Sequence, residues 1–255
     1  MGKNKRNISK LDNEYREKIA DYAISKNLKC KNAILVLKAT GCRPNELKNG
    51  VKVKLSDDLK NIEFTIIGSK LNSKMKRGIR MRKISVSLYK NNEFNEYLKP
   101  LIEDINTSEN SMIRVSISSE NAFSGYISKI SKRLWPRKTY HASAYSFRHS
   151  FATDLKNSGV NNIEIAKSMG HASTRSQLSY GRKRRNSSGD VSPIASVDAS
   201  SAPRDKSDRL LRFKIQNKNK KLSVKPISEV ISSIEKRSGS VNMPESAPKK
   251  KGFKM

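Results

Sequence analysis

The sequence has 255 residues, of which 53 are lysine or arginine and 23 are aspartate or glutamate, so its formal net charge is +30. A chain with this charge repels itself unless a polyanion neutralises it, which makes nucleic acid the first partner to consider. An anionic membrane surface is the rival partner. However, no apolar run approaches the roughly 18 residues of a membrane span, and the lysine-rich N-terminus lacks the apolar core of a signal peptide. We therefore expect a cytoplasmic, DNA-associated protein without a membrane segment.

The elements predicted before residue 180 form an α+β domain that is mostly helical. Three segments alternate in polarity or are rich in β-branched residues, which predicts a small antiparallel three-stranded sheet with a long lysine-rich loop between its last two strands. Apolar residues recur at helical spacing in most of the remainder. We expect strands over 51–55, 62–68 and 82–88, helices over 11–26, 31–41, 92–105, 119–135 and 145–155, and a short helix that ends at Gly170. The sequence has no internal repeat and no glycine-rich phosphate loop.

The composition changes after Tyr180. Residues 181–255 contain 19 basic and 7 acidic residues. The first part of this segment is rich in serine and proline and buries too little apolar surface to offset the entropy of ordering. We expect one domain over 1–182 and a largely disordered basic tail over 183–255. Within the tail, 226–237 has four branched apolar residues on one helical face, which fits either a short docked helix or a transient one.

The two cysteines, Cys30 and Cys42, lie in segments of apolar helical pattern and not at the spacing of a metal site or a disulfide. We interpret both as small buried hydrophobic residues. The sequence therefore predicts neither a metal nor a cofactor.

The segment ATGCRPNEL contains the first candidate for chemistry, Arg43. Gly41 closes the preceding helix as a C-terminal cap, so Arg43 lies at a helix boundary from which its guanidinium projects. Pro44 suits the first turn of the next helix, and Glu46 in that turn complements the helix dipole. Taken alone, the segment also fits a surface arginine beside a turn.

The segment YSFRHSFATDL contains the second candidate. Aromatic and leucine residues recur here every four positions and form the buried face of a helix. Arg148 and Tyr145 are three residues apart and share a second, polar face of this helix, next to the buried face. His149 is turned by about 100° from Arg148 around the helix axis, and we interpret it as a packing residue.

The segment EIAKSMGHASTRSQLSY contains the third candidate. Its short helix stops at a glycine, and His171 comes directly after that end. Ser173 or Thr174 caps the next helix, on which Tyr180 lies near the C-terminal end. A lone histidine in such a place usually bonds the helix end, and a lone tyrosine is usually a half-buried packing residue.

Together the three segments match one family in order, spacing and local context. TGCRPNEL, then FRHSFATDLKNSG, then MGHAS with a tyrosine nine residues after its histidine closely resemble the catalytic domain of the tyrosine recombinases, the phage-integrase family. The resemblance covers about residues 8–182. It implies an enzyme that cleaves and rejoins double-stranded DNA at specific sites without metal or ATP, working as a homo-oligomer, a tetramer. A tyrosine attacks the phosphodiester and forms a 3′-phosphotyrosine link, and a 5′-hydroxyl later reverses the attack.

The resemblance also implies a role for each matching residue. Tyr180 matches the nucleophile, and His171 matches a histidine that donates a hydrogen bond to the phosphate. Arg43 and Arg148 match the two arginines that clamp the phosphate. Forked guanidinium groups suit a pentavalent phosphate better than a point charge does.

The leaving 5′-oxygen needs a proton, which the family takes from a lysine on the loop after its second strand. Lys70 directly follows the apolar strand and is the residue we select. Lys74 and Lys76 stay open as alternatives, because this loop is longer and richer in lysine than usual.

One position departs from the family pattern. Most members have a histidine three residues before the second arginine, where it acts as a general base or contacts the phosphate, and this chain has Tyr145. A tyrosine can donate to a phosphate oxygen but accepts protons poorly near neutral pH. His141 is a nearby candidate to substitute for the missing histidine.

A second departure concerns the N-terminal helical domain with which most members grip the opposite face of the duplex. Here the catalytic pattern begins near residue 8, so we expect no separate domain of that kind. Two functions remain. The set of Arg43, Arg148, His171 and Tyr180 favours a site-specific recombinase, whereas Tyr145 and the missing domain favour a DNA-binding accessory protein without strand transfer.

Overall fold

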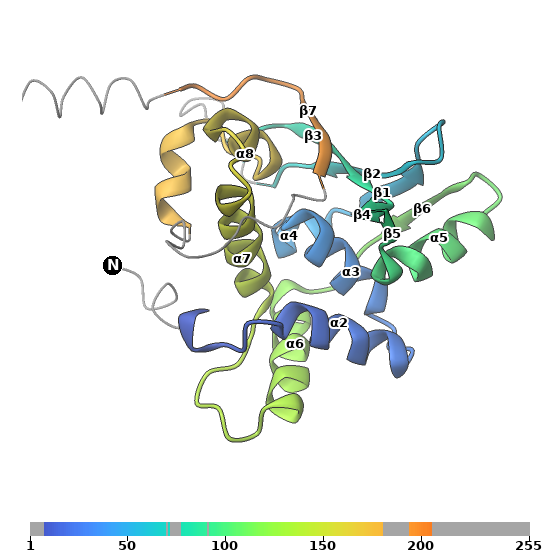
Figure 1. Ribbon diagram of the computed structural model, residues 1–255, viewed down its shortest axis with the longest axis vertical. Helices are drawn as coiled ribbons and strands as arrows, with labels where there is room; N and C mark the ends of the chain where they lie inside the picture. The colour runs from blue at the N-terminus through green and yellow to red at the C-terminus, as the bar shows by residue number, and fades with distance from the viewer. Residues whose placement is uncertain (1–7, 70, 72–77, 91, 181–193, 206–255) are drawn as a thin grey trace, which may run out of the picture. The chain divides into compact units, whose positions relative to one another are not determined.

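The computed structural model describes residues 8–69, 71, 78–90, 92–180 and 194–205, which lie in one compact unit (Figure 1). The described residues contain seven α-helices, none long and apolar enough to cross a membrane. The helices are α2 (Tyr15–Ser25), α3 (Lys31–Thr40), α4 (Pro44–Lys48), α5 (Lys99–Asn106), α6 (Glu120–Leu134), α7 (Ala144–Asn157) and α8 (Asn162–Ser168), with short 3-10 helices η1 (Ile8–Lys10), η2 (Glu96–Leu98) and η3 (Thr174–Ser179). The strands are β1 (Val51–Leu55), β2 (Asn61–Ile67), β3 (Met81–Ser87), β4 (Tyr89–Lys90), β5 (Glu93–Phe94), β6 (Met112–Val115) and β7 (Ile194–Ala199).

The main sheet has five strands in the order β6-β1-β2-β3-β7, and every neighbouring pair is antiparallel. The three predicted strands are confirmed as its centre, β1, β2 and β3. The predicted sheet of three strands is nevertheless too small, because β6 pairs with the free edge of β1 and β7 pairs with the free edge of β3. The α+β class is confirmed.

Strand β7 corrects one part of the prediction of a largely disordered tail over 183–255. Its register pairs Val197 with Ile84, and beyond the strand the Ser200 N–H donates to the Met81 carbonyl at 2.9 Å. The open edge of β3 supplies backbone partners, so this serine-rich segment is ordered by a distant strand and not by its own composition. The rest of the tail, including the helix suggested at 226–237, lies outside the described residues.

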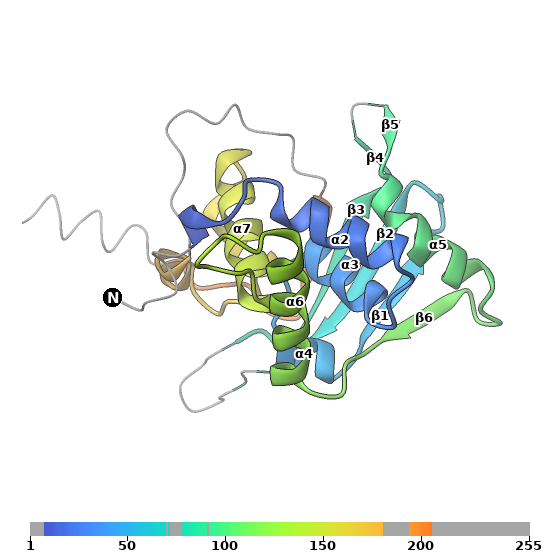
Figure 2. The same cartoon turned by 90° about the horizontal axis from the view of Figure 1, so that it is seen from below.

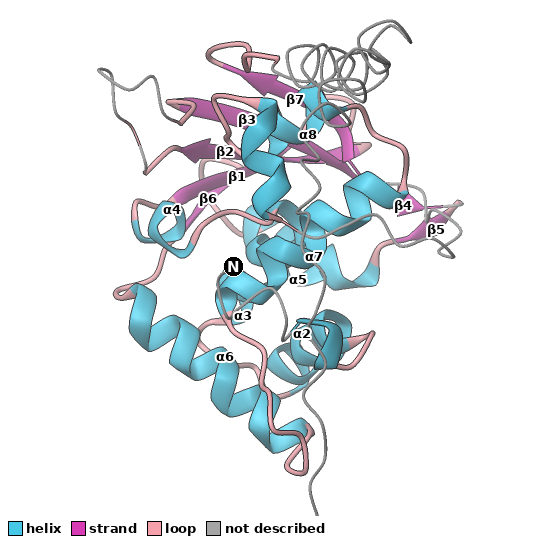
Figure 3. Cartoon of the chain, turned by 90° about the vertical axis from the view of Figure 1, so that its left-hand side faces the viewer, coloured by secondary structure: helices cyan, strands magenta, loops and turns pink. Residues whose placement is uncertain are grey.

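One face of the sheet is buried and the other is polar. Val53, Phe64 and Ile84 are fully buried and belong to one core with residues of the helices. Helices α3 and α5 pack on this side, as Figures 2 and 3 show. Lys52 and Lys83 lie at alternate positions and point to the opposite face, as the two-residue period of strands requires.

Two predicted helices begin later than expected. The segment 92–105 starts with β5 and η2, and helix α5 begins only at Lys99. Pro100 explains this start, because proline fits the first turn of a helix and breaks its interior. Helix α2 begins at Tyr15, after Asp12 has accepted a hydrogen bond from the Glu14 N–H at 3.1 Å.

The buried interpretation of the cysteines is confirmed for Cys42 and holds only in part for Cys30, which is half-buried. Burial raises the pKa of the Cys42 thiol to about 11. This thiol is therefore neutral and acts as a core residue.

Candidate active site

Arg43 lies at the junction of α3 and α4, and this junction packs closely against α7. Gly41 ends α3 in the left-handed conformation with a φ of +55°, and its N–H donates to the Leu37 carbonyl at 2.9 Å. A Cβ at Gly41 would lie 2.5 Å from Cδ1 of Phe151 on α7, so a glycine is needed here for two reasons. The predicted cap is confirmed, and it brings Arg43 next to the helix that carries Arg148.

Arg148 is the centre of the site. It lies in the second turn of α7 and is fully buried. It donates from Nη1 to the Gly41 carbonyl at 2.8 Å and from Nη2 to the Met169 carbonyl at 2.5 Å. Its Nε donates to the Tyr180 hydroxyl at 3.2 Å. Burial and the neighbouring Arg43 lower the pKa of Arg148. A buried guanidinium held by neutral oxygens keeps its charge available to an anion.

His171 follows the end of α8 and contacts the same guanidinium. Its Nε2 lies 3.2 Å from Nη2 of Arg148, and only 4% of the residue is exposed. Because a guanidinium has no acceptor, Nε2 accepts this bond, and the proton of the neutral ring lies on Nδ1. Nδ1 is buried and has no hydrogen-bond partner among the described residues. The ring therefore holds an unused N–H donor inside the site.

Tyr180 completes the group from the end of η3. Its ring centroid lies 5.1 Å from that of His171 and 4.9 Å from that of His149, and Cζ of Arg148 lies 5.2 Å from it. Lys156 on α7 donates to the Tyr180 carbonyl at 3.1 Å and so ties its backbone to the helix that carries Arg148. The predicted cap at Ser173 is confirmed, but η3 is a 3-10 helix and Tyr180 comes directly after it.

Glu46 is the carboxylate of this site. It is fully buried and accepts from the Arg43 N–H at 2.7 Å and from Nη1 of Arg43 at 2.7 Å. Arg82 on β3, also buried, donates to both of its oxygens, at 3.2 and 2.8 Å. Burial alone would raise the pKa of Glu46, but the charge and hydrogen bonds of Arg82 hold it well below the usual range. Glu46 is thus ionised and offsets part of the positive charge of three arginines.

Two further residues were predicted for this site, Tyr145 and Lys70. Tyr145, in the first turn of α7, is 41% exposed, and burial together with Glu120 raises the pKa of its hydroxyl, whereas the charge of Arg43 lowers it. Lys70, like the alternatives Lys74 and Lys76, lies outside the described residues. Its place as proton donor stays a prediction.

Sequence reasoning missed two members of the site and set aside a third. Arg82 occurs in a strand whose inward positions include Ile84 and Val86, so the alternation already placed a charge on the buried face. Glu46 was interpreted only as a helix-dipole residue, yet its distance of three positions from Arg43 also allows a direct pair. His149, which was interpreted from the sequence as a packing residue, lies with its ring against that of Tyr180.

The His171 ring makes the stability of the protein depend on pH. Burial and the charge of Arg148 lower the pKa of His171 from 6.5 to about 2, so the unfolded chain binds a proton below pH 6.5 that the folded chain does not. The free energy of unfolding therefore falls as the pH decreases below 6.5. We expect His171 to contribute a loss of about 2 kcal/mol between pH 7 and pH 5.

Urea unfolding at pH 7, 6 and 5 measures this slope. His171→Gln removes the group, so its free energy of unfolding should change less over this range than that of the wild type. His141→Gln is the matched control, since it leaves His171 in place and should retain the slope. An equal slope in wild type and His171→Gln would contradict a buried neutral ring.

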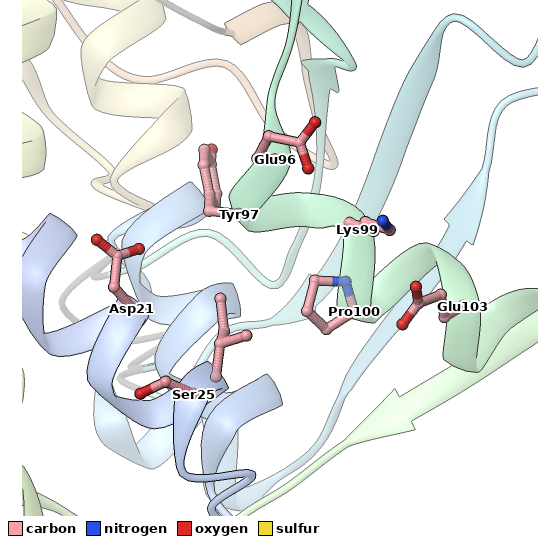
Figure 4. Close-up of a pocket in the computed structure, with 8 residues that line it drawn as sticks. Asp21, Ser25, Glu96, Tyr97, Lys99, Pro100 and Glu103 are labelled. Carbon is pink, nitrogen blue, oxygen red and sulfur yellow. The ribbon is translucent and has the colours of Figure 1, made fainter.

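A separate hollow of about 420 Å³ lies between α2 and the η2–α5 segment (Figure 4). Its lining includes three carboxylates, Asp21, Glu96 and Glu103, and a single lysine, Lys99. Carboxylates repel a phosphate group, so this hollow is unsuited to a nucleic-acid backbone. The cluster around Arg148 is the better candidate.

Comparison with solved structures gives partial matches to recombinases and an integrase. XerA recombinase is 19% identical with a TM-score of 0.49, and the match covers 69% of this chain and 60% of that one. XerH site-specific recombinase bound to palindromic difH substrate, a post-cleavage complex, is 20% identical with a TM-score of 0.46, covering 66% and 47%. The Tn1549 transposon integrase in complex with a circular intermediate DNA is 15% identical with a TM-score of 0.45, covering 69% and 62%. The chain thus spans between 47% and 62% of the length of these relatives.

No curated protein matches the chain significantly. The model of the phage integrase family, in contrast, matches residues 9–186, which include Arg43, Arg148, His171 and Tyr180. This match extends over more than half of the sequence, and it confirms the resemblance carried by the three motifs. The chain belongs to the phage integrase family.

Proposed function

We propose that the protein cleaves and rejoins double-stranded DNA through a covalent 3′-phosphotyrosine link at Tyr180. The observation that carries this proposal is the hydrogen bond of 3.2 Å between the Tyr180 hydroxyl and the buried Arg148, beside the His171 ring. A nucleophile, a fixed cation and an unused N–H donor in one place are what phosphoryl transfer requires.

In the proposed reaction, the Tyr180 oxygen attacks the phosphorus, and the bond from phosphorus to the 5′-oxygen breaks. Arg43 and Arg148 stabilise the charge that gathers on the phosphate, and His171 donates a hydrogen bond to one of its oxygens. The departing 5′-oxygen takes its proton from Lys70. Attack of a 5′-hydroxyl on the phosphotyrosine reverses these steps and rejoins the strand.

A phenol in water has a pKa of about 10, so at neutral pH its proton must leave as the attack proceeds. We assign this proton to His149, whose ring centroid lies 4.9 Å from that of Tyr180. The pKa of about 2 makes His171 a poor acceptor. Tyr145, which is partly exposed, has the role of a hydrogen-bond donor to the phosphate and not of a base.

The proposed partners follow from charge and chemistry. A net charge of +30 favours a phosphate backbone, since each neutralised phosphate releases counterions. Recombination of two duplexes breaks four strands, and each cleavage needs its own tyrosine, which is the reason to propose a homo-tetramer on recombination sites.

One observation favours a second function. Tyr145 occupies the position of a histidine in most relatives and is 41% exposed. A chain that binds DNA without strand transfer, as an accessory protein, fits this departure. The two functions differ in a single result, the formation of a covalent bond.

A search for the covalent adduct tests the proposal. Duplexes that bind the full chain are recovered from a randomised pool and rebuilt with a nick at successive positions, so that the cleaved fragment diffuses away. We expect a protease-sensitive adduct on a denaturing gel. Tight binding to these duplexes without any adduct would support the accessory function and reject the enzyme.

A further inference from the structure

Arg82 is an arginine buried inside a β-sheet. It lies near the start of β3, its side chain is fully buried, and it belongs to the same face as Ile84 and Val86. Lys83, the next residue, points to the opposite face and pairs with Glu63 at 2.7 Å, as an ordinary strand lysine does. Burying a guanidinium is costly unless its donors are satisfied, so the partners of Arg82 indicate its purpose.

The donors of Arg82 reach two different parts of the chain. Nη1 and Nη2 bind the two oxygens of Glu46, at 3.2 and 2.8 Å, in a forked pair. Nε donates to the Ser168 carbonyl at 2.9 Å. Glu46 lies in α4, three residues after Arg43, and Ser168 ends α8, three residues before His171. One planar group therefore joins the segment that carries Arg43 to the segment that carries His171.

The turn between Ser168 and His171 is built around this guanidinium. Gly170 has a φ of +61°, and a Cβ at this position would lie 2.7 Å from Nη1 of Arg82. A side chain there would push Arg82 or the turn away. The His171 N–H donates to the Ala166 carbonyl at 2.8 Å, so the backbone of the histidine is fixed to the same helix end.

Arg82 and Arg43 bind the same carboxylate, that of Glu46. Nη1 of Arg43 donates to Glu46, whereas its Nε and Nη2 have no hydrogen-bond partner among the described residues. Because Arg43 and Arg82 share one carboxylate, Glu46 neutralises only part of the positive charge of the two guanidinium groups. Arg43 keeps two donors for another anion.

From these contacts we infer that Arg82 is a positioning residue for the reaction: it holds Arg43, through Glu46, and His171, through Ser168, in fixed positions relative to each other. This inference rests on the proposed function. Arg82 acts through other residues and contacts neither Tyr180 nor Arg148 in any described hydrogen bond. Lysine cannot replace it, since an ammonium group lacks the planar fork that serves both segments.

The test compares Arg82→Gln and Arg82→Lys with the matched control Lys83→Gln, which removes one charge from the same strand. At saturating DNA we expect the rate of adduct formation to fall about 100-fold in Arg82→Gln, as for a small displacement of catalytic groups. The rate of adduct formation in Arg82→Lys should exceed that in Arg82→Gln by less than about tenfold, because lysine restores the charge but not the planar fork. The affinity for DNA should match that of Lys83→Gln, and the control should cleave at the wild-type rate.

Two results would overturn the inference. One is an Arg82→Gln protein that is folded by circular dichroism and cleaves as fast as Lys83→Gln. The other is a lack of change in the ¹⁵N NMR spectra of the DNA-free proteins. We expect the ring signals of His171 and the Nε signal of Arg43 to shift in Arg82→Gln and to stay in place in Lys83→Gln. Unchanged signals overturn the inference even if the wild type forms no adduct, a result that would reject the proposed function alone.

Discussion

Tyr180→Phe should form no covalent adduct with nicked DNA, while its affinity for the same DNA stays within about threefold of the wild type. The phenyl ring keeps the contacts with His149 and His171 but has no oxygen to attack phosphorus. The variant should also stay folded. It loses one hydrogen bond from Arg148, which is worth roughly 1 kcal/mol.

Labelled nicked duplex, a denaturing gel and a binding assay on the same preparation measure both quantities. Tyr89→Phe is the matched control, because Tyr89 is 55% exposed and its ring packs on that of Phe94 in the β4–β5 hairpin. It should form the adduct at the wild-type rate. An adduct in Tyr180→Phe would show that another side chain attacks, and Tyr145, whose hydroxyl lies within the field of Arg43 and Arg148, would be tested next.

Local pattern predicted the centre of the sheet and missed its edges for a physical reason. Strands β1, β2 and β3 carry their own signal, since alternating residues such as Ile62, Phe64 and Ile66 fill the core. Strand β7 exposes or half-exposes all its side chains except Val197, and its order comes from hydrogen bonds to β3. Local sequence pattern cannot predict a strand that is stabilised by hydrogen bonds to another strand more than 100 residues away.

The residues of the candidate site also fall into two groups, those that the sequence predicted and those that only the fold shows. Arg43, Arg148, His171 and Tyr180 were found because each lies in a short motif that resembles a known family. Arg82 lies in no such motif. Its partners, Glu46 and Ser168, are 36 and 86 residues distant in sequence, so only the fold brings the three together. His149 was interpreted as a packing residue, and its spacing in the helix does not show that the ring it contacts is that of Tyr180.

Glu46→Gln should lower the free energy of unfolding by about 3–5 kcal/mol at pH 7, which is the cost of removing one partner from a buried ion pair. The amide keeps the shape of the side chain but removes the only carboxylate that the described structure places in hydrogen-bond contact with Arg43 and Arg82. Arg148, fully buried nearby, then adds to an uncompensated cluster of three positive charges. Urea unfolding of wild type and variant measures the loss.

The pH dependence separates this effect from a packing defect. The pKa of Glu46 lies far below its ordinary value of 4.5 in the folded protein, so the carboxylate stabilises the fold at all pH values above 4.5 and this contribution is lost as the pH falls further. The difference between wild type and Glu46→Gln should therefore shrink below pH 4.5, whereas a packing defect would leave it constant. Glu17→Gln is the control: this carboxylate is 43% exposed and lies 4.0 Å from Lys38, so its removal should cost less than about 1 kcal/mol. A loss in Glu46→Gln as small as in the control would mean that the arginines do not depend on Glu46 for their charge balance.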